Sequence, residues 1–349
     1  MEFYTYQIQQ EDTLEELAGK HGLAVDELLD FHNSRANLTQ QIFNNDIPYH
    51  IKKLFLPAVD EHAKTKAVNQ TSFRNVARYR CEQSNVSRIN NEIITLSAHT
   101  FSEFLVSQAE NAEVYNFEMT DFTFEVDPVV YEKGFLFAQK LEKLKLPLTC
   151  RITDNGRAEV FNFNETGKKW IAFRDHELQK DEIFQQLLAQ APKQAEDIIV
   201  TGNKEFLEKT KFSDNLDKNL FFHIFFRASL GSALQDYELH QFSQLFPNIT
   251  LNTAVVKSLV KEDDDQATYR LVGTLKRENL SDNELKKRYD EIYKSALKFS
   301  YTEFDFIYRI TYTVHKESKL LLEGKASIAE KIKNNFEVIT EYKIKRVEV

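Results

Sequence analysis

The chain has 349 residues, of which 42% are hydrophobic, and its formal net charge is −9. A chain of this length can bury a substantial core and is expected to form two or three domains. The acidic balance, and the lack of any Lys/Arg run longer than three residues, argue against a nucleic-acid partner. The 28 Phe residues, against only 9 Gly and 6 Pro, favour long regular elements with few tight turns.

Neither a membrane span nor an export signal is predicted. No segment approaches the roughly 18 uninterrupted apolar residues that a spanning helix needs. The first 20 residues contain five acidic side chains and no apolar core of signal-peptide length. We therefore expect a cytoplasmic protein.

The first 57 residues predict a small module of strand, helix, helix and strand. Residues 3–8 are a β-rich run, and residues 54–56 are a closing strand that Pro57 ends. Asp12 or Thr13 can cap the first helix, and two helical segments follow. Their inward-facing positions are Leu14, Leu17, Ala18, His21, Val25, Leu28, Leu29 and His32.

This module resembles the LysM family. The resemblance is carried by Tyr6, Ile8, Asp12-Thr13-Leu14, Leu17-Ala18, His21-Gly22, Leu28, Asn33 and Leu54-Phe55-Leu56-Pro57. It implies two helices on one side of a two-stranded antiparallel sheet. It also implies binding of glycans that contain N-acetylglucosamine, such as peptidoglycan or chitin, in a groove between two loops. The glycan- or partner-binding residues that it implies are Gln10, Glu11, Asp12, Thr13, Asn33, Arg35, Asn37, Asn44, Asn45 and Tyr49.

Two departures from the family pattern favour a protein partner over a glycan. Glu11 stands where the family usually has Gly, so its side chain can crowd the backbone that would meet an acetamido group. The second loop, between Asn33 and Leu54, is also long, and such an insertion can reshape or cover the groove. A module made without an export signal also has little access to wall glycan.

The fold class predicted for the whole chain is α+β. Residues 58–72 are polar and predict a linker. The body then divides into a β-rich subdomain (73–174), a helical block (175–246) and an antiparallel sheet with one helix (247–349).

Several local signals define the body more sharply. Alternation over residues 114–126 slips near Asp121, which indicates a β-bulge. Asp154-Asn155-Gly156 predicts a hairpin turn. Residues 220–226 are apolar nearly all round, which indicates a central buried helix. The remaining predicted elements are a short helix over 234–245, a hairpin over 249–275 with its turn at 262–265, a capped helix over 281–298, and three strands over 304–314, 319–329 and 336–347.

Candidate chemistry in the body is sparse, and no catalytic residue, metal site or cofactor is predicted. Cys81 and Cys150 read as buried free thiols, and the nine His residues show no metal-binding spacing. His223, inside the apolar helix, is favoured as a core histidine over a catalytic base. Trp170 is favoured as a core aromatic over a contact point. Phosphate loops and nucleophile elbows are absent from the sequence.

These observations predict a non-catalytic binding or adaptor protein with a protein partner. Its layout is loosely similar to LysM-containing components of bacterial contractile injection systems, including type VI secretion. One alternative is a protein that binds peptidoglycan or chitin. Another is a cell-wall hydrolase with an unrecognised catalytic body, since the two carboxyl groups of a glycosidase need not be close in sequence.

Overall fold

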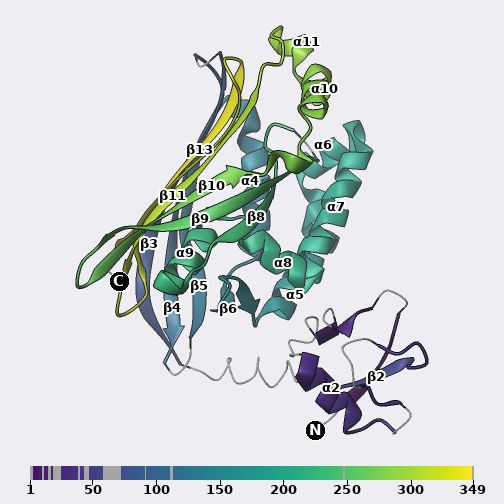
Figure 1. Cartoon of the computed structure of the whole chain (residues 1–349). Coiled ribbons are helices and arrows are strands. Elements are labelled where there is room, and N and C mark those ends of the chain that lie inside the picture. The colour runs from purple at the N-terminus through teal and green to yellow at the C-terminus, as the bar shows by residue number, and fades with distance from the viewer. Residues whose placement is uncertain are drawn as a thin grey trace. The chain divides into compact units, whose positions relative to one another are not determined.

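The computed structural model describes residues 3–9, 12–14, 17–18, 25–37, 40–42, 47–57, 72–90, 92–110, 113–246 and 248–347. The chain divides into two compact units, residues 1–70 and residues 71–349. We call them the N-terminal unit and the body (Figure 1). Most of the predicted linker, residues 58–71, lies outside the described residues.

The N-terminal unit contains a two-stranded antiparallel sheet and a helix. Strand β1 (Phe3–Gln7) pairs with β2 (Lys53–Pro57), and α2 (Val25–Asn33) contacts β2. Leu14, Leu17 and Ala18 are helical, as expected for the first predicted helix, whereas His21 and Gly22 lie outside the described residues. The small core consists of Leu14, Leu17, Ala18, Leu28, Leu29, Ile42, Ile51, Leu54 and Leu56.

His32 links α2 to two other segments of the N-terminal unit through hydrogen bonds. Its side chain is fully buried; its Nε2 lies 2.9 Å from the Gln40 carbonyl oxygen, and its Nδ1 accepts the backbone N–H of Phe55 at 3.1 Å. A neutral imidazole satisfies both partners, one nitrogen donating and the other accepting. Burial lowers the pKa of His32, which favours that neutral form. The predicted packing role of His32 is confirmed.

Eleven strands of the described residues form one antiparallel sheet in the body. The first strand of the body pairs with the last along its length, so the β-rich and C-terminal segments predicted separately make one sheet. In sheet order the strands are β7 (Ala158–Val160), β6 (Leu148–Ile152), β5 (Val114–Asp127), β4 (Ile93–Ala109), β3 (Phe73–Ile89), β13 (Phe336–Val347), β12 (Leu321–Ile332), β11 (Phe304–His315), β10 (Gln266–Leu275), β9 (Thr250–Glu262) and β8 (Tyr237–Phe242).

Helices gather on one side of this curved sheet, and a further pair follows β10 (Figure 1). Together with the sheet they confirm the α+β class. None of the helices in the described residues is long and apolar enough to cross a bilayer. The helices are α4 (Glu132–Leu144), α5 (Phe163–Ala172), α6 (Glu182–Gln190), α7 (Pro192–Leu207), α8 (Lys209–Leu216), α9 (Leu220–Leu230), α10 (Asp282–Ile292) and α11 (Lys294–Leu297).

Local turn and cap signals in the body are confirmed. The 153–157 turn joins β6 to β7, with Gly156 at φ +75°, a conformation that glycine adopts without strain. The register of β4 against β5 shifts opposite Asp121, where the bulge was predicted. The Ser281 side chain accepts the backbone N–H of Glu284 and begins α10. Both cysteines are buried free thiols.

Two predicted elements are wrong. The β-rich subdomain was expected to reach residue 174, but residues 163–172 form α5, because Thr166, Gly167 and Trp170 recur at helical spacing and face the core. A short helix was expected over 234–245, but residues 237–242 form strand β8. Exposure alternates residue by residue along β8, which is the period of a strand with one face covered.

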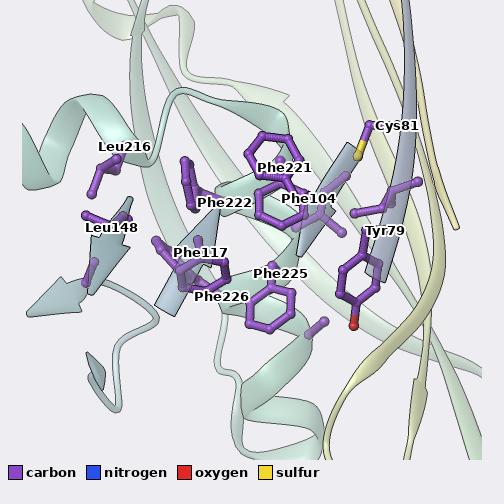
Figure 2. Packing of buried hydrophobic residues seen from close by; sticks show 14 of the residues in the cluster. Tyr79, Cys81, Phe104, Phe117, Leu148, Leu216, Phe221, Phe222, Phe225 and Phe226 are labelled. Atoms are coloured by element: carbon purple, nitrogen blue, oxygen red, sulfur yellow. The ribbon is translucent and has the colours of Figure 1, made fainter. Parts of the chain in front are cut away.

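The core of the body is built around α9, as the apolar run predicted. Phe221 stacks on Phe104 of β4 with ring centroids 3.9 Å apart, and Phe117 of β5 contacts four phenylalanines of the helix (Figure 2). On the opposite wall, Gly324 of β12 lies against α9: a Cβ there would sit 3.3 Å from Ile224. The sheet therefore curves around the helix and contacts it from both of its halves.

Candidate functional site

The predicted binding residues of the N-terminal unit fall into three structural situations. Gln10, Glu11, Asn44 and Asn45 lie outside the described residues. Asp12 and Asn33 brace the backbone: the Asp12 carboxylate accepts from the Tyr6 hydroxyl at 2.9 Å and from the Gln9 N–H at 2.7 Å. The Asn33 amide makes a reciprocal pair of hydrogen bonds with the backbone of Ile42, at 2.7 and 2.8 Å. These two side chains hold the loops rather than point to a ligand.

The remaining predicted residues offer contact surface. Tyr49 is 91% exposed, and the Lys52 ammonium lies 4.1 Å from its ring centroid. Arg35 lies over the Phe31 ring at 3.5 Å and also donates to the Phe31 carbonyl. The side chains of Thr13 and Asn37 are exposed. Tyr49 and Arg35 therefore provide a flat aromatic and a guanidinium, the residue types that contribute most to protein interfaces.

The body has a cleft of about 610 Å³ between the sheet and its helices. The volume suits a small-molecule site. Its sheet wall comes from β3, β8, β11, β12 and β13, and its helical wall from α4, α7, α8 and the start of α9. The lining residues are Gln83, Asn85, Glu142, Lys145, Glu205, Asn215, Asp217, Lys218, Asn219, Leu220, His223, Leu239, Gln241, Phe242, Gln244, Tyr308, Ile328 and Thr340.

A buried ionic network lies at the floor of this cleft. Both guanidinium Nη atoms of Arg227 donate to the carboxylate of Asp217, Nη2 to Oδ2 at 2.8 Å, and Nη1 also donates to the Gly156 carbonyl at 3.2 Å. His223 Nδ1 lies 3.0 Å from the backbone oxygen of Asp217, and its Nε2 lies 2.7 Å from the Tyr308 hydroxyl. The network therefore ties α9 to the 153–157 turn and to the sheet.

The electrostatics of the network suit a structural role. Burial would raise the pKa of the Asp217 carboxyl, but contacts from His223 and Arg227 outweigh it and hold that pKa well below its usual range. Burial, reinforced by the Arg227 charge, lowers the pKa of His223, and Asp217 opposes it only in part. Burial also raises the pKa of Tyr308 far above its usual value. His223 is therefore neutral and lies between the ionised Asp217 carboxylate and the protonated Tyr308 hydroxyl. This state supports the prediction that His223 is a core histidine.

This arrangement predicts acid sensitivity of the body. His223 and Asp217 both have folded-state pKa values below their unfolded values of 6.5 and 3.8, so the unfolded chain binds protons first as pH falls. We expect the unfolding free energy to decline below about pH 6.5 and again below about pH 4. Denaturant titrations followed by fluorescence of Trp170, the only tryptophan, report on the body alone. His223→Gln should flatten the slope between pH 7.5 and 5.5; an unchanged slope would contradict the assignment.

A second ionic group closes another part of the cleft. Lys145 is buried, and its ammonium lies 2.7 Å from a carboxylate oxygen of Glu142 and 2.7 Å from one of Glu205. Burial lowers the pKa of Lys145, but the two carboxylates outweigh it, and the net pKa is raised. A glycosidase places the bond to be broken between its two carboxyl groups. Here a lysine ammonium occupies that space, so this acid pair is built as a salt-bridged brace.

Sequence reasoning did not identify the network, apart from His223. The available signal was Arg227, a charge at the end of an otherwise apolar helix, because a buried guanidinium requires an anionic partner. Asp217 lies ten residues earlier, before the helix begins, and Tyr308 lies in another segment, so neither could be assigned from spacing. Within the described ranges, no group of three or more His, Cys, Asp or Glu side chains is arranged to hold a metal ion.

A second hollow, of about 760 Å³, lies near the ends of strands β9 to β13. Its lining comes from strands and their turns and has both charge signs, without a helical wall. The lining residues are Lys261, Asp263, Gln266, Thr268, Thr313, Leu322, Glu323, Lys345, Arg346 and Val347. The cleft between the sheet and the helices is therefore the better candidate site of the body.

No protein-family model and no curated protein sequence matches the chain. Among solved structures, one of lipovitellin, titled for lipid–protein interactions, aligns with a TM-score of 0.37 and 9% identity. The alignment covers 80% of this chain and 25% of the lipovitellin chain, so this chain spans about a quarter of that length. A DUF1329 family protein from Desulfovibrio piger aligns with a TM-score of 0.12 and 9% identity over 82% of this chain and 90% of that one. Neither similarity is high enough to carry an argument.

Proposed function

We propose that the chain is a non-catalytic binding protein of a larger assembly, with the N-terminal unit as a LysM-like recognition head and the body as a rigid support. The observation that best supports this proposal is the division into two compact units with separate cores. The smaller unit carries Tyr49, whose 91% exposure is the highest among the exposed large hydrophobic side chains of the described residues. An exposed aromatic on a small separate unit is suited to contact a partner.

The ion pairs of the cleft support a non-catalytic role. At the cleft, Asp217 is paired with Arg227, and Glu142 and Glu205 are both paired with Lys145. A general acid or base needs a carboxyl or imidazole that can exchange a proton with a substrate. Pairs of this kind instead stabilise one ionisation state and one conformation. The setting we propose is a bacterial contractile injection apparatus, such as a type VI secretion system, with one of its structural proteins as the partner.

Tyr49→Ala in the full-length chain tests the recognition head. We expect about a tenfold loss of partner recovery, because a central aromatic contributes a large buried area to an interface. Tyr131→Ala is the matched control, since Tyr131 is 50% exposed on the body. The measurement is quantitative mass spectrometry of proteins that co-purify with each tagged variant, scored for sheath, tube and spike components.

Three outcomes would count against this function. Equal recovery from the Tyr49 and Tyr131 variants would remove the role of the head. Retention on purified peptidoglycan or chitin that Tyr49→Ala abolishes would replace the assembly role with glycan binding. Clearing zones in cell-wall zymograms would show a hydrolase.

A further inference from the structure

The cleft of the body has hydrogen-bonding groups that the fold does not use. Asn85 is the clearest case: its Oδ1 accepts from the Thr340 hydroxyl at 2.8 Å and from the Gln83 amide at 3.3 Å. Both lone pairs of that oxygen are therefore engaged, whereas its NH2 group donates to no atom of the described residues. Gln241 lies on β8 and Gln244 follows that strand, and both line the cleft. Their side-chain amides likewise make no hydrogen bond within the described part of the chain. Three amides thus remain available to a ligand.

The cleft does not select a charged ligand. Its two negative charges at Glu142 and Glu205 share the positive charge of Lys145. Asp217 is neutralised by Arg227, and the Lys218 ammonium donates to the Asn215 amide oxygen at 2.7 Å. The lining charges and Arg227 therefore sum to about zero, with no cluster of one sign. An anion such as a phosphate would find no set of free cationic donors here.

The rim of the cleft carries an exposed aromatic ring. Phe242 is 63% exposed and lies at the end of β8, where it pairs with Thr250 of β9. The Lys218 ammonium lies 5.5 Å from its ring centroid. The face of a phenyl ring is electron-rich, so it attracts polarised C–H groups as well as cations. A sugar ring presents such C–H groups on its faces and hydroxyl groups around its edge.

We propose that this cleft binds a neutral saccharide. The amides of Asn85, Gln241 and Gln244 exchange hydrogen bonds with the sugar hydroxyls, since an amide both donates and accepts, as a hydroxyl does. Phe242 covers the face of one ring at the entrance. Leu220, Leu239 and Ile328 form the apolar part of the wall. This site belongs to the body and does not depend on what the N-terminal unit recognises.

The test is isothermal titration of the full-length chain with three neutral probes: maltotriose, cellotriose and N,N′,N″-triacetylchitotriose. We expect at least one to bind with a Kd below about 1 mM. Phe242→Ala and Gln241→Ala should each weaken that binding by about tenfold, through loss of ring contact and of hydrogen bonds. Phe101→Ala is the matched control for the aromatic change, because Phe101 is 44% exposed on the opposite face of the sheet. Tyr49→Ala controls for the N-terminal unit, and both controls should bind like the unchanged chain.

Three results would overturn the proposal. The first is that none of the three saccharides binds. The second is binding that Tyr49→Ala abolishes and Phe242→Ala leaves unchanged, which would place the sugar on the N-terminal unit and bear on the proposed function instead. The third is binding of N-acetyl-trialanine amide, a neutral peptide probe, in place of any saccharide. Trp170 fluorescence during denaturant titration verifies that each variant retains a folded body.

Discussion

Replacing Asp217 by Asn is expected to lower the unfolding free energy of the body by about 3–5 kcal/mol, because it leaves the buried Arg227 guanidinium without a counter-charge. The side chain of Arg227 is only 5% exposed, and Asp217 accepts from both of its Nη atoms. Removing one member of such a pair costs far more than the pair itself contributes. Denaturant titration followed by Trp170 fluorescence measures the change.

Asp214→Asn is the matched control for this substitution. Asp214 lies one turn earlier, pairs with Arg157 at 3.4 Å, and both side chains are largely in solvent. Surface pairs of this kind contribute about 0–1 kcal/mol. Equal effects of the two substitutions would show that Arg227 does not depend on the Asp217 charge. The proposed contribution of the network to the stability of the body would then be wrong.

Phe117→Ala is expected to destabilise the body by about 3–5 kcal/mol, since it opens a cavity between the sheet and α9. Phe117 is fully buried and lies with its ring centroid 5.1 to 6.1 Å from those of Phe221, Phe222, Phe225 and Phe226. Loss of this ring removes contacts with four neighbours at once, and a β-strand backbone cannot close the gap by itself. The same fluorescence titration measures the effect.

Phe101→Ala again supplies the control, because the same ring is removed from the outer face of the neighbouring strand. Its expected effect is within about 1 kcal/mol, as for most exposed substitutions. A small effect of Phe117→Ala would mean that α9 shifts to fill the space. The aromatic cluster would then be less specific than its ring geometry indicates.

Local elements of this fold could be predicted where the signal lies within a few residues. Asp154-Asn155-Gly156 defined the hairpin because only certain residues accept the backbone conformation of the turn. Ser281 defined the start of α10 through one side-chain hydrogen bond. The prediction failed at residues 237–242, where the apolar positions fit a helical and an alternating pattern equally well. Packing of Tyr237 and Leu239 against the core of the body decided between them.

Of the buried network in the cleft, only one residue could be predicted from the sequence. His223 could be placed in the core from sequence, because it lies in a run that is apolar nearly all round. Its partners could not be assigned from the sequence. Asp217 ends α8, Arg227 lies near the end of α9 and Tyr308 lies on β11, and only the fold brings them together. The cleft itself draws on residues from Gln83 to Thr340, and no local pattern marks them as neighbours.

By itself the sequence determined the α+β class of the body, the apolar character of α9, the hairpin turns and much of the small core of the N-terminal unit. These features follow from the period of apolar residues and from backbone preferences, which act over a few positions. Only the tertiary structure decided that β3 pairs with β13 to make one sheet, and that the sheet curves around α9 and leaves a polar cleft beside it. Strand order and cleft lining depend on contacts between residues far apart in the chain, and such contacts leave no periodic trace in a single sequence.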